Sequence, residues 1–418
     1  MLVSLPYGRS QLTGHVPEWA VTDVVIPMQW QAVSQVDAVK AALKEPIGVS
    51  RLRELARGTH SAAIVTCDRT RGVPSRLTIP LILEELRSGG MDLDRVKVLV
   101  ATGLHKGETI VDAGERLGEE LLDRLRVEIH DSDDRAQLVE LGKLPSGAPL
   151  YLNRSVVDSD LVIVESNVEP HFFAGFTGGS KVILPGVAGT ETILRNHCWH
   201  NIDHPTSRYG VIENPIRAEA NEALRYLNRT FALNFVFDIR KRIVHATAGD
   251  PISSFNAAAE SVSLHSRVQI DEAPDLVITT NGGYPLDRNV YQCVKGIAVP
   301  ERILHQDSRI IMASECMDGV GHQEFLRLLA SDTPEAVYDK LGKGEVLIRD
   351  QWEVQVLCRV LRKTPVCFVT RPELAPEIRS MHMDYAQTIE QALDSVNLHK
   401  GESVLVLPQG PMTLPTLE

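Results

Sequence analysis

The sequence predicts an α/β fold of two domains, with mostly parallel or mixed sheets flanked by helices and an active site in the cleft between the domains. The chain has 418 residues, which is more than one ordinary hydrophobic core accommodates. Short β-rich apolar runs recur along it, and helical patterns lie between several of them. Strands that alternate with helices usually pair in parallel. Loops at the carboxyl ends of parallel strands converge on a crevice, so the positions just past each strand are the first candidates for function.

Each predicted strand is a short apolar run, and each predicted helix has apolar residues at three- and four-residue spacing. The strands are predicted over 62–66, 96–100, 161–165, 231–237, 276–280, 310–313 and 404–407, and the helices over 81–87, 117–125, 221–227 and 324–329. A polar segment at 271–274 precedes a fresh strand. We therefore predict domains over 1–271 and 272–418.

Composition narrows the possible partners. The formal net charge of -12 is spread in patches of mixed sign without a basic stripe, which argues against nucleic acid as a partner. The six cysteines include no CxxC pair, which indicates a reducing compartment. The N-terminus lacks an apolar signal region, and no run approaches the roughly 18 apolar residues of a membrane span. We expect a cytoplasmic protein that does not enter membranes.

A charged loop follows the first predicted strand. Here Asp68 and Arg71 stand beside a glycine and a proline, with Arg69 and Arg76 close by. A guanidinium can bind a carboxylate through two hydrogen bonds, and Asp68 could orient the arginine or accept a hydrogen bond from a substrate hydroxyl. This pattern predicts a site for an organic acid, and the alternative is a charged surface turn.

Two histidines follow the next strands, His105 in TGLH and His171 before the loop GFTGGSK. Histidine transfers protons near neutral pH, although a lone histidine is often structural. In the loop, the glycines 178 and 179 could bring backbone N–H groups to a phosphate, with Lys181 as a charge or a nucleophile. A serine before the lysine excludes a Walker motif, and no GxGxxG fingerprint follows a strand. The alternative is a tight structural turn.

Three further histidines cluster downstream, at 197, 200 and 204. On one helix they would share a face and could bind a transition metal. This predicts a zinc-dependent hydrolase as an alternative function, although the glutamate of an HExxH motif is missing.

The second domain contributes a candidate binding helix after the glycine-rich approach to Asn289. Gln292 and Lys295 are three residues apart and therefore point the same way. Both could donate hydrogen bonds to an oxygen-rich anion. The alternative is a solvated helix face.

Taken together, these motifs resemble those of the lactate racemase family, whose members use a nickel-pincer nucleotide. The resemblance rests on elements that occur in family order along most of the chain: Asp68-x-x-Arg71, His105 in TGLH, His171 with Lys181, His197, and Tyr291-Gln292-x-x-Lys295. It implies a first domain that carries catalysis and the cofactor, and a second that adds substrate-binding residues.

The resemblance also implies a role for each residue. Lys181 would tether the cofactor, pyridinium-3,5-bisthiocarboxylic acid mononucleotide nickel, with Gly178 and Gly179 admitting it, and His197 would be the metal ligand. His105 and His171 would be the acid/base pair. The residues that hold the substrate would be Asp68, Arg71, Tyr291, Gln292 and Lys295. Partners would be a small 2-hydroxy acid and the cofactor-biosynthesis proteins that load the enzyme.

The reaction implied is racemisation by hydride removal and return through a 2-keto acid. Direct loss of the α-proton is difficult because a carbanion beside a carboxylate is unstable. Arg195, two residues before His197, adds a cation and makes a dicarboxylate such as malate an alternative to lactate. A non-catalytic protein that binds a nucleotide or an organic acid is a further alternative.

Overall fold

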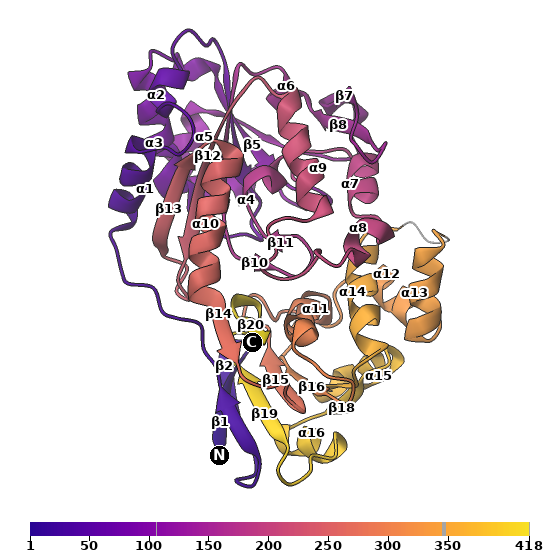
Figure 1. Ribbon diagram of the computed structural model, residues 1–418. Coiled ribbons are helices and arrows are strands. Elements are labelled where there is room, and N and C mark those ends of the chain that lie inside the picture. Colours follow the sequence, from indigo (N-terminus) through magenta and orange to yellow (C-terminus); the bar gives the residue numbers. More distant parts are fainter. Residues whose placement is uncertain (106, 345–347, 418) are drawn as a thin grey trace.

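The computed structural model describes residues 1–105, 107–344 and 348–417. In these residues two six-stranded sheets, each flanked by helices, form two bodies that lie one above the other in Figure 1. The predicted α/β class, with parallel and mixed sheets, is confirmed. None of the described helices is long and apolar enough to cross a membrane.

The first sheet has the order β13-β12-β9-β4-β5-β6. All neighbours pair in parallel except β12 and β13, so this sheet is mixed. Its central strands are fully buried, which matches their uninterrupted apolar sequences. The strands are β4 (Ala62–Cys67), β5 (Val96–Ala101), β6 (Arg126–Ile129), β9 (Leu161–Asn167), β12 (Arg229–Phe237) and β13 (Ile243–Gly249).

Helices precede or follow these strands along the chain. They are α1 (Gln35–Lys44), α2 (Leu52–Leu55), α3 (Ser75–Ser88), α4 (Ile110–Leu117), α5 (Glu119–Arg124), α6 (Arg154–Val157), α7 (Thr190–Asn196), α8 (Trp199–Asp203), α9 (Pro215–Ala223) and α10 (Pro251–Ser266). The helix predicted over 117–125 is wrong at its start, because Gly118 has a φ of 87° and separates α4 from α5. The pattern at 221–227 belongs to the end of α9 and the 3-10 turn Leu224–Tyr226.

The second sheet has the order β18-β17-β16-β15-β19-β3 and is parallel throughout. Its strands are β3 (Val21–Val24), β15 (Leu276–Thr280), β16 (Arg309–Ala313), β17 (Val366–Val369), β18 (Asp384–Ala386) and β19 (Ser403–Leu407). Its helices are α11 (Val290–Ala298), α12 (Gln323–Leu329), α13 (Pro334–Gly342), α14 (Gln351–Leu361), α15 (Ala375–Ser380) and α16 (Ile389–Ser395).

The first residues of the chain belong to this second body. The hairpin of β1 (Leu2–Tyr7) and β2 (Ser10–His15) packs in one apolar core with the second sheet. Strand β3 is an edge strand of that sheet. Figure 1 shows this indigo hairpin beside the yellow β19. The predicted boundary at 271–274 falls between β14 (Arg267–Ile270) and β15. The domain ranges 1–271 and 272–418 stay a prediction.

Short hairpins complete the fold. They are β7 (Leu138–Lys143) with β8 (Pro149–Asn153) and β10 (Pro170–His171) with β11 (Gly175–Phe176), while β14 pairs with β20 (Leu414–Leu417). The β10–β11 segment lies where the two bodies meet, because its phenylalanines share an apolar core with α11 and α14. The Tyr209 hydroxyl also donates a hydrogen bond to the carbonyl of Lys295 at 3.0 Å across this contact.

Candidate active site

Three neighbouring strands of the first sheet deliver the predicted residues to one edge. Asp68 directly follows β4, His105 lies in the loop after β5, and His171 forms part of β10 just past β9. Because β9, β4 and β5 are adjacent and parallel, their carboxyl ends lie side by side. The fold therefore brings together residues that are far apart in the sequence.

Asp68 and His105 form a tightly bonded pair. Nδ1 of His105 lies 2.6 Å from Oδ2 of Asp68, and the other carboxylate oxygen accepts a hydrogen bond from the backbone N–H of Thr70 at 3.0 Å. Burial acts to raise the pKa of Asp68, but the hydrogen bond and charge of His105, with Thr70 and Arg71, lower it to about 2. The carboxylate is therefore ionised and fixes the imidazole through Nδ1, which leaves proton exchange with a substrate to Nε2.

His171 is buried beside Lys181. Its Nε2 lies 3.4 Å from Nζ of Lys181, and its Nδ1 is within hydrogen-bond distance of the backbone N–H of Ala174, at 3.3 Å. Burial holds the pKa of His171 well below its usual range, and the charges of Lys181, Arg71, Lys295 and His197 lower it further. His171 is therefore a neutral imidazole at neutral pH, the form that accepts a proton.

Lys181 lies in the 3-10 turn Gly179–Val182. Burial and, after it, the charge of Arg217 hold the pKa of Lys181 well below its usual range. Arg217 is buried and donates hydrogen bonds to the carbonyls of Phe176, at 2.5 Å, and Gly178, at 3.2 Å, so it also fixes the loop that carries the lysine. A neutral, fixed amine is a nucleophile.

The glycines before Lys181 are explained by packing. Gly178 and Gly179 have φ angles of 79° and 59°, which favour glycine. A Cβ on Gly178 would lie 2.6 Å from the carbonyl oxygen of Asn167, and one on Gly179 would lie 2.8 Å from the ring of Phe255. Both positions require glycine whether or not a nucleotide binds nearby, so their predicted contact with a cofactor stays a prediction.

The state of Lys181 leads to a testable prediction. A lysine whose pKa is lowered becomes a free amine at lower pH, so the rate of acetylation by trace acetic anhydride should rise at lower pH for Lys181 than for the surface residue Lys40. Peptide mass spectrometry of the protein without cofactor over a range of pH would measure both profiles, and the midpoint of each profile does not depend on how far burial slows the reagent. In Arg217→Gln the midpoint for Lys181 should move to higher pH, because the neighbouring charge is gone. The same midpoint for both lysines in the unaltered protein would contradict the assignment.

His197 follows the last residue of α7 and is buried between aromatic rings. Its ring centre lies 5.2 Å from that of Phe173 and 4.9 Å from that of Trp352. Its Nδ1 is buried without a hydrogen-bond partner. Burial, with the charge of Lys181, lowers the pKa of His197 to about 3. A neutral imidazole with an unpartnered buried nitrogen suits a metal ligand, because a buried polar atom is normally satisfied.

The expected face of three histidines does not form. His197 ends one helix, and the chain turns at Cys198 before α8 begins, so His200 and His204 are exposed elsewhere. Within the described parts of the chain, no group of three or more His, Cys, Asp and Glu side chains is placed to hold a metal ion. The prediction of a shared helix face is wrong, because the helix ends at Asn196.

Helix α11 supplies the second body's part of the site. The side chain of Asn289 caps this helix by accepting from the N–H of Gln292 at 3.0 Å. The predicted pair on one face is confirmed, because Nζ of Lys295 donates to Oε1 of Gln292 at 2.6 Å. Burial and the charge of Arg71 lower the pKa of Lys295. Arg71 also interacts with Tyr291, so the charges of a cation from each body act on one another here, an arrangement that suits a carboxylate.

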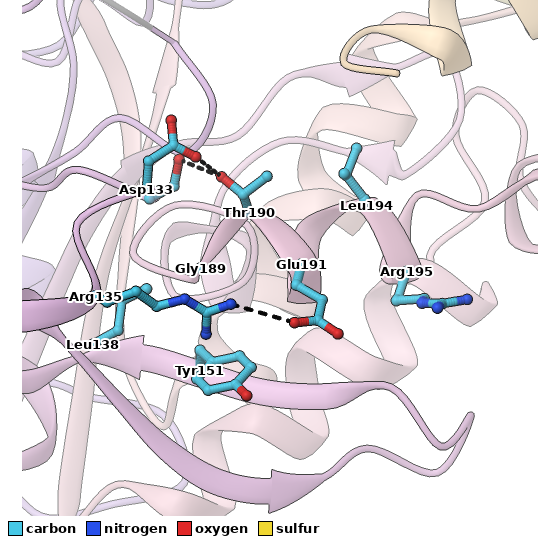
Figure 2. A pocket seen from close by; sticks show the side chains of 10 residues that line it. Asp133, Arg135, Leu138, Tyr151, Gly189, Thr190, Glu191, Leu194 and Arg195 are labelled. Atoms are coloured by element: carbon cyan, nitrogen blue, oxygen red, sulfur yellow. Dashed lines mark hydrogen bonds and ion pairs between the residues drawn. The ribbon is translucent and has the colours of Figure 1, made fainter. Parts of the chain in front are cut away.

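Arg195 does not share this space. It is exposed on α7 and lines a hollow of about 440 Å³ whose wall contains no other predicted site residue. In Figure 2, Arg135 of this hollow reaches Glu191, and Arg195 lies further along the same helix as Glu191. The structure gives no support to Arg195 as a ligand of the substrate.

A substitution checks this placement. Arg195→Ala should leave the ratio of kcat/KM for lactate to that for malate unchanged within about twofold, because exposed surface changes have small effects. Arg71→Ala is the positive comparison and should weaken the binding of either acid. A large change in the ratio for Arg195→Ala would place that arginine at the substrate.

Some residues of the site carry no motif in the sequence. Trp352 packs on His197, Arg217 fixes the loop before Lys181, and Asp350 bonds Tyr291. All three lie far from their partners along the chain. No local pattern in the sequence indicates any of the three.

The comparisons with known proteins agree with this geometry. A family model of the lactate racemase N-terminal domain matches residues 7–210, and one of the C-terminal domain matches residues 269–413. A lactate racemase from Thermoanaerobacterium thermosaccharolyticum is 39% identical over 98% of this chain and 97% of its own. One from Lactiplantibacillus plantarum is 34% identical over 98% of each chain.

Solved structures extend the match to the fold. The lactate racemase apoprotein from Thermoanaerobacterium thermosaccharolyticum has a TM-score of 0.93 at 37% identity, with both chains covered over 100% of their length. A protein from Thermotoga maritima shares the fold alone, with a TM-score of 0.71 at 19% identity over 94% of this chain and all of its own.

The fold and these matches define an isomerase of the racemase and epimerase class. The chain belongs to the lactate racemase family.

Proposed function

We propose that this protein racemises a small 2-hydroxy acid, with lactate as the first candidate, by removal and return of hydride with a nickel-pincer nucleotide. The observation that carries the proposal is the buried group in which His171 lies 3.4 Å from Lys181 and faces Arg71 and Lys295. Two relatives of full length are named lactate racemase.

The residues present fit the cofactor. Lys181 has a buried amine of lowered pKa, as formation of a covalent thioamide needs, and it lies in a loop fixed by Arg217. His197 has a buried nitrogen without a hydrogen-bond partner and is neutral, as a nickel ligand must be. We propose that Lys181 tethers the nucleotide and that His197 binds its nickel. The chemistry that this group supplies when bound is reversible acceptance of hydride from the substrate carbon, with a 2-keto acid between the two enantiomers.

The chain's own residues bind the substrate and move its proton. Arg71 of the first body and Lys295 of the second interact through their charges and would hold the carboxylate throughout, which prevents escape of the reactive species. One of the two histidines, His105 fixed by Asp68 or His171, would take the hydroxyl proton from one enantiomer. The other histidine would deliver a proton to the keto oxygen as the opposite enantiomer forms. Two histidines are needed because racemisation runs in both directions.

Lactate suits the site better than malate. The argument for a second carboxylate depended on Arg195, which is exposed on a separate hollow. The second carboxylate of malate would therefore need another cation. The cations whose charges act most on His171 are Lys181, Arg71 and Lys295, and each already has a proposed role.

The proposal also includes a location and partners. The six cysteines are free thiols, as in a reducing cytoplasm. Proteins that build the nickel-pincer nucleotide would have to load this enzyme, so activity should depend on a host that makes the cofactor.

The test is purification from such a host, followed by nickel analysis and an assay of optical rotation with D- and L-lactate and D- and L-malate. We expect about one nickel per chain and racemisation of lactate in both directions. If a host that loads a known relative yields protein without nickel and without racemase activity, the proposal fails. A non-catalytic binding protein would then be the better explanation. A zinc-dependent hydrolase would not be, because His197, His200 and His204 do not share a helix face.

A further inference from the structure

A chain of hydrogen bonds in the second body ends at Tyr291. The Tyr291 hydroxyl donates to Oδ1 of Asp350 at 2.8 Å, and the other oxygen of Asp350 lies 2.5 Å from Nδ1 of His322. The ring of His322 stacks on that of Tyr291, with 4.3 Å between centres and 19° between planes. Asp350 and His322 thus hold the phenol through its hydroxyl and through its ring.

The backbone of Asp350 indicates that its side chain is placed for this purpose. Asp350 has a φ of 66°, a left-handed conformation that is uncommon for a residue other than glycine. It stands at the N-cap of α14, where an aspartate usually accepts from the first helical N–H groups, yet it makes no such bond. Its carboxylate bonds Tyr291 and His322 instead. Left-handed backbone conformations of residues other than glycine cluster at functional sites.

Charged groups from both bodies surround this chain. Asp350 interacts with His105 of the first body and with Glu353 one turn along α14, while Tyr291 interacts with Arg71 and Glu353. Burial acts to raise the pKa of Asp350, but the bond and charge of His322 outweigh it and lower that pKa. The same bond raises the pKa of His322 above its usual value. The chain of hydrogen bonds therefore runs from the half-exposed ring of His322 through Asp350 to Tyr291, close enough to Arg71 and His105 to interact with their charges.

We propose that Asp350 and His322 are positioning residues that hold the phenol of Tyr291 toward the substrate. The Tyr291 hydroxyl donates its hydrogen bond to Asp350. Its oxygen therefore keeps lone pairs that can accept a hydrogen bond from the hydroxyl of a 2-hydroxy acid. This inference rests on the proposed function and adds two residues, neither of which touches the reacting atoms.

The pair itself can be tested on protein without cofactor. The imidazole of His322 is titrated by NMR, with His322→Gln used to assign its signal. In Asp350→Asn the pKa of His322 should fall, because the ionic hydrogen bond that raises it is lost while burial still acts to lower it. An unchanged pKa in this variant would overturn the pair, whatever the enzyme's activity.

The action through Tyr291 is tested by a double-mutant cycle in the loaded enzyme. Asp350→Gly removes the carboxylate and suits the left-handed backbone, and Tyr291→Phe removes the hydroxyl. Each change should lower kcat/KM for lactate by about tenfold, and the double variant should be within about twofold of the single ones, because both remove the same interaction. Asp350→Asn should recover part of the loss, since its amide oxygen can still accept from Tyr291.

Asp332→Gly, which removes a surface partner of Lys340, is the matched control and should keep full activity. A merely structural role for Asp350 would give losses that multiply to about a hundredfold, and that result would overturn the inference. If the unaltered loaded enzyme does not racemise lactate, the proposed function fails, and the NMR titration then decides on the pair alone.

Discussion

His171→Asn is expected to lower kcat for racemisation of lactate by about 10²- to 10⁴-fold, the usual contribution of a positioned acid or base. His171 is buried and neutral, and its Nε2 faces Lys181 in the centre of the site. Every turnover in either direction uses both histidines, so the rates from D- and from L-lactate should fall by the same factor. Stopped assays with each enantiomer would measure this, and KM should change little.

His204→Asn is the matched control for this substitution. His204 is exposed and its imidazole bonds to the neighbouring Thr206, so loss of this side chain should leave kcat unchanged. Nickel content should be the same in both variants. If His171→Asn retained full activity, or if the His204 change removed it, the assignment of the acid/base residue would be wrong.

Lys181→Arg is expected to abolish both activity and covalent attachment of the cofactor. Arginine keeps the positive charge but offers no nucleophilic amine, so this change separates a tether from a simple charge. Intact-mass spectra under denaturing conditions should show the added mass of the nucleotide on the unaltered enzyme and no addition on the variant.

Lys97→Arg serves as the control, because Lys97 is a part-buried lysine that bonds Ser155 and stands at the amino end of β5, whereas the site follows the carboxyl ends of the strands. It should carry the cofactor normally. If Lys181→Arg stayed active, or if the unaltered active enzyme carried no added mass, the lysine would hold the nucleotide by charge alone.

The sequence could predict the part of the site that follows from parallel strands. Asp68, His105 and His171 each come just after a buried apolar run, and adjacent parallel strands bring such positions to one edge. Gln292 and Lys295 could be paired because three residues separate them on one helix. These predictions required only local patterns and one general rule of α/β folds.

The rest depends on contacts that no local pattern encodes. Tyr291 and Asp350 are 59 positions apart, and their bond depends on how α11 packs against α14. Strand β3 joins the second sheet through pairing with β19, nearly the whole chain away. The helix end at Asn196 lacks a glycine stop signal, which is why three histidines were assigned to one face. Arg195 was assigned to the substrate because it stands two residues before His197, and closeness in sequence does not show which way a side chain points.

The central claim is that the hydrogen on the substrate carbon leaves and returns as hydride. The most direct test is racemisation of L-lactate that carries deuterium at carbon 2, in ordinary water, with the D-lactate product analysed by mass spectrometry. The account predicts that most of the D-lactate keeps its deuterium, because hydride held inside the buried site does not exchange with water. Replacement of that deuterium by solvent hydrogen would show a proton-abstraction mechanism and contradict the account.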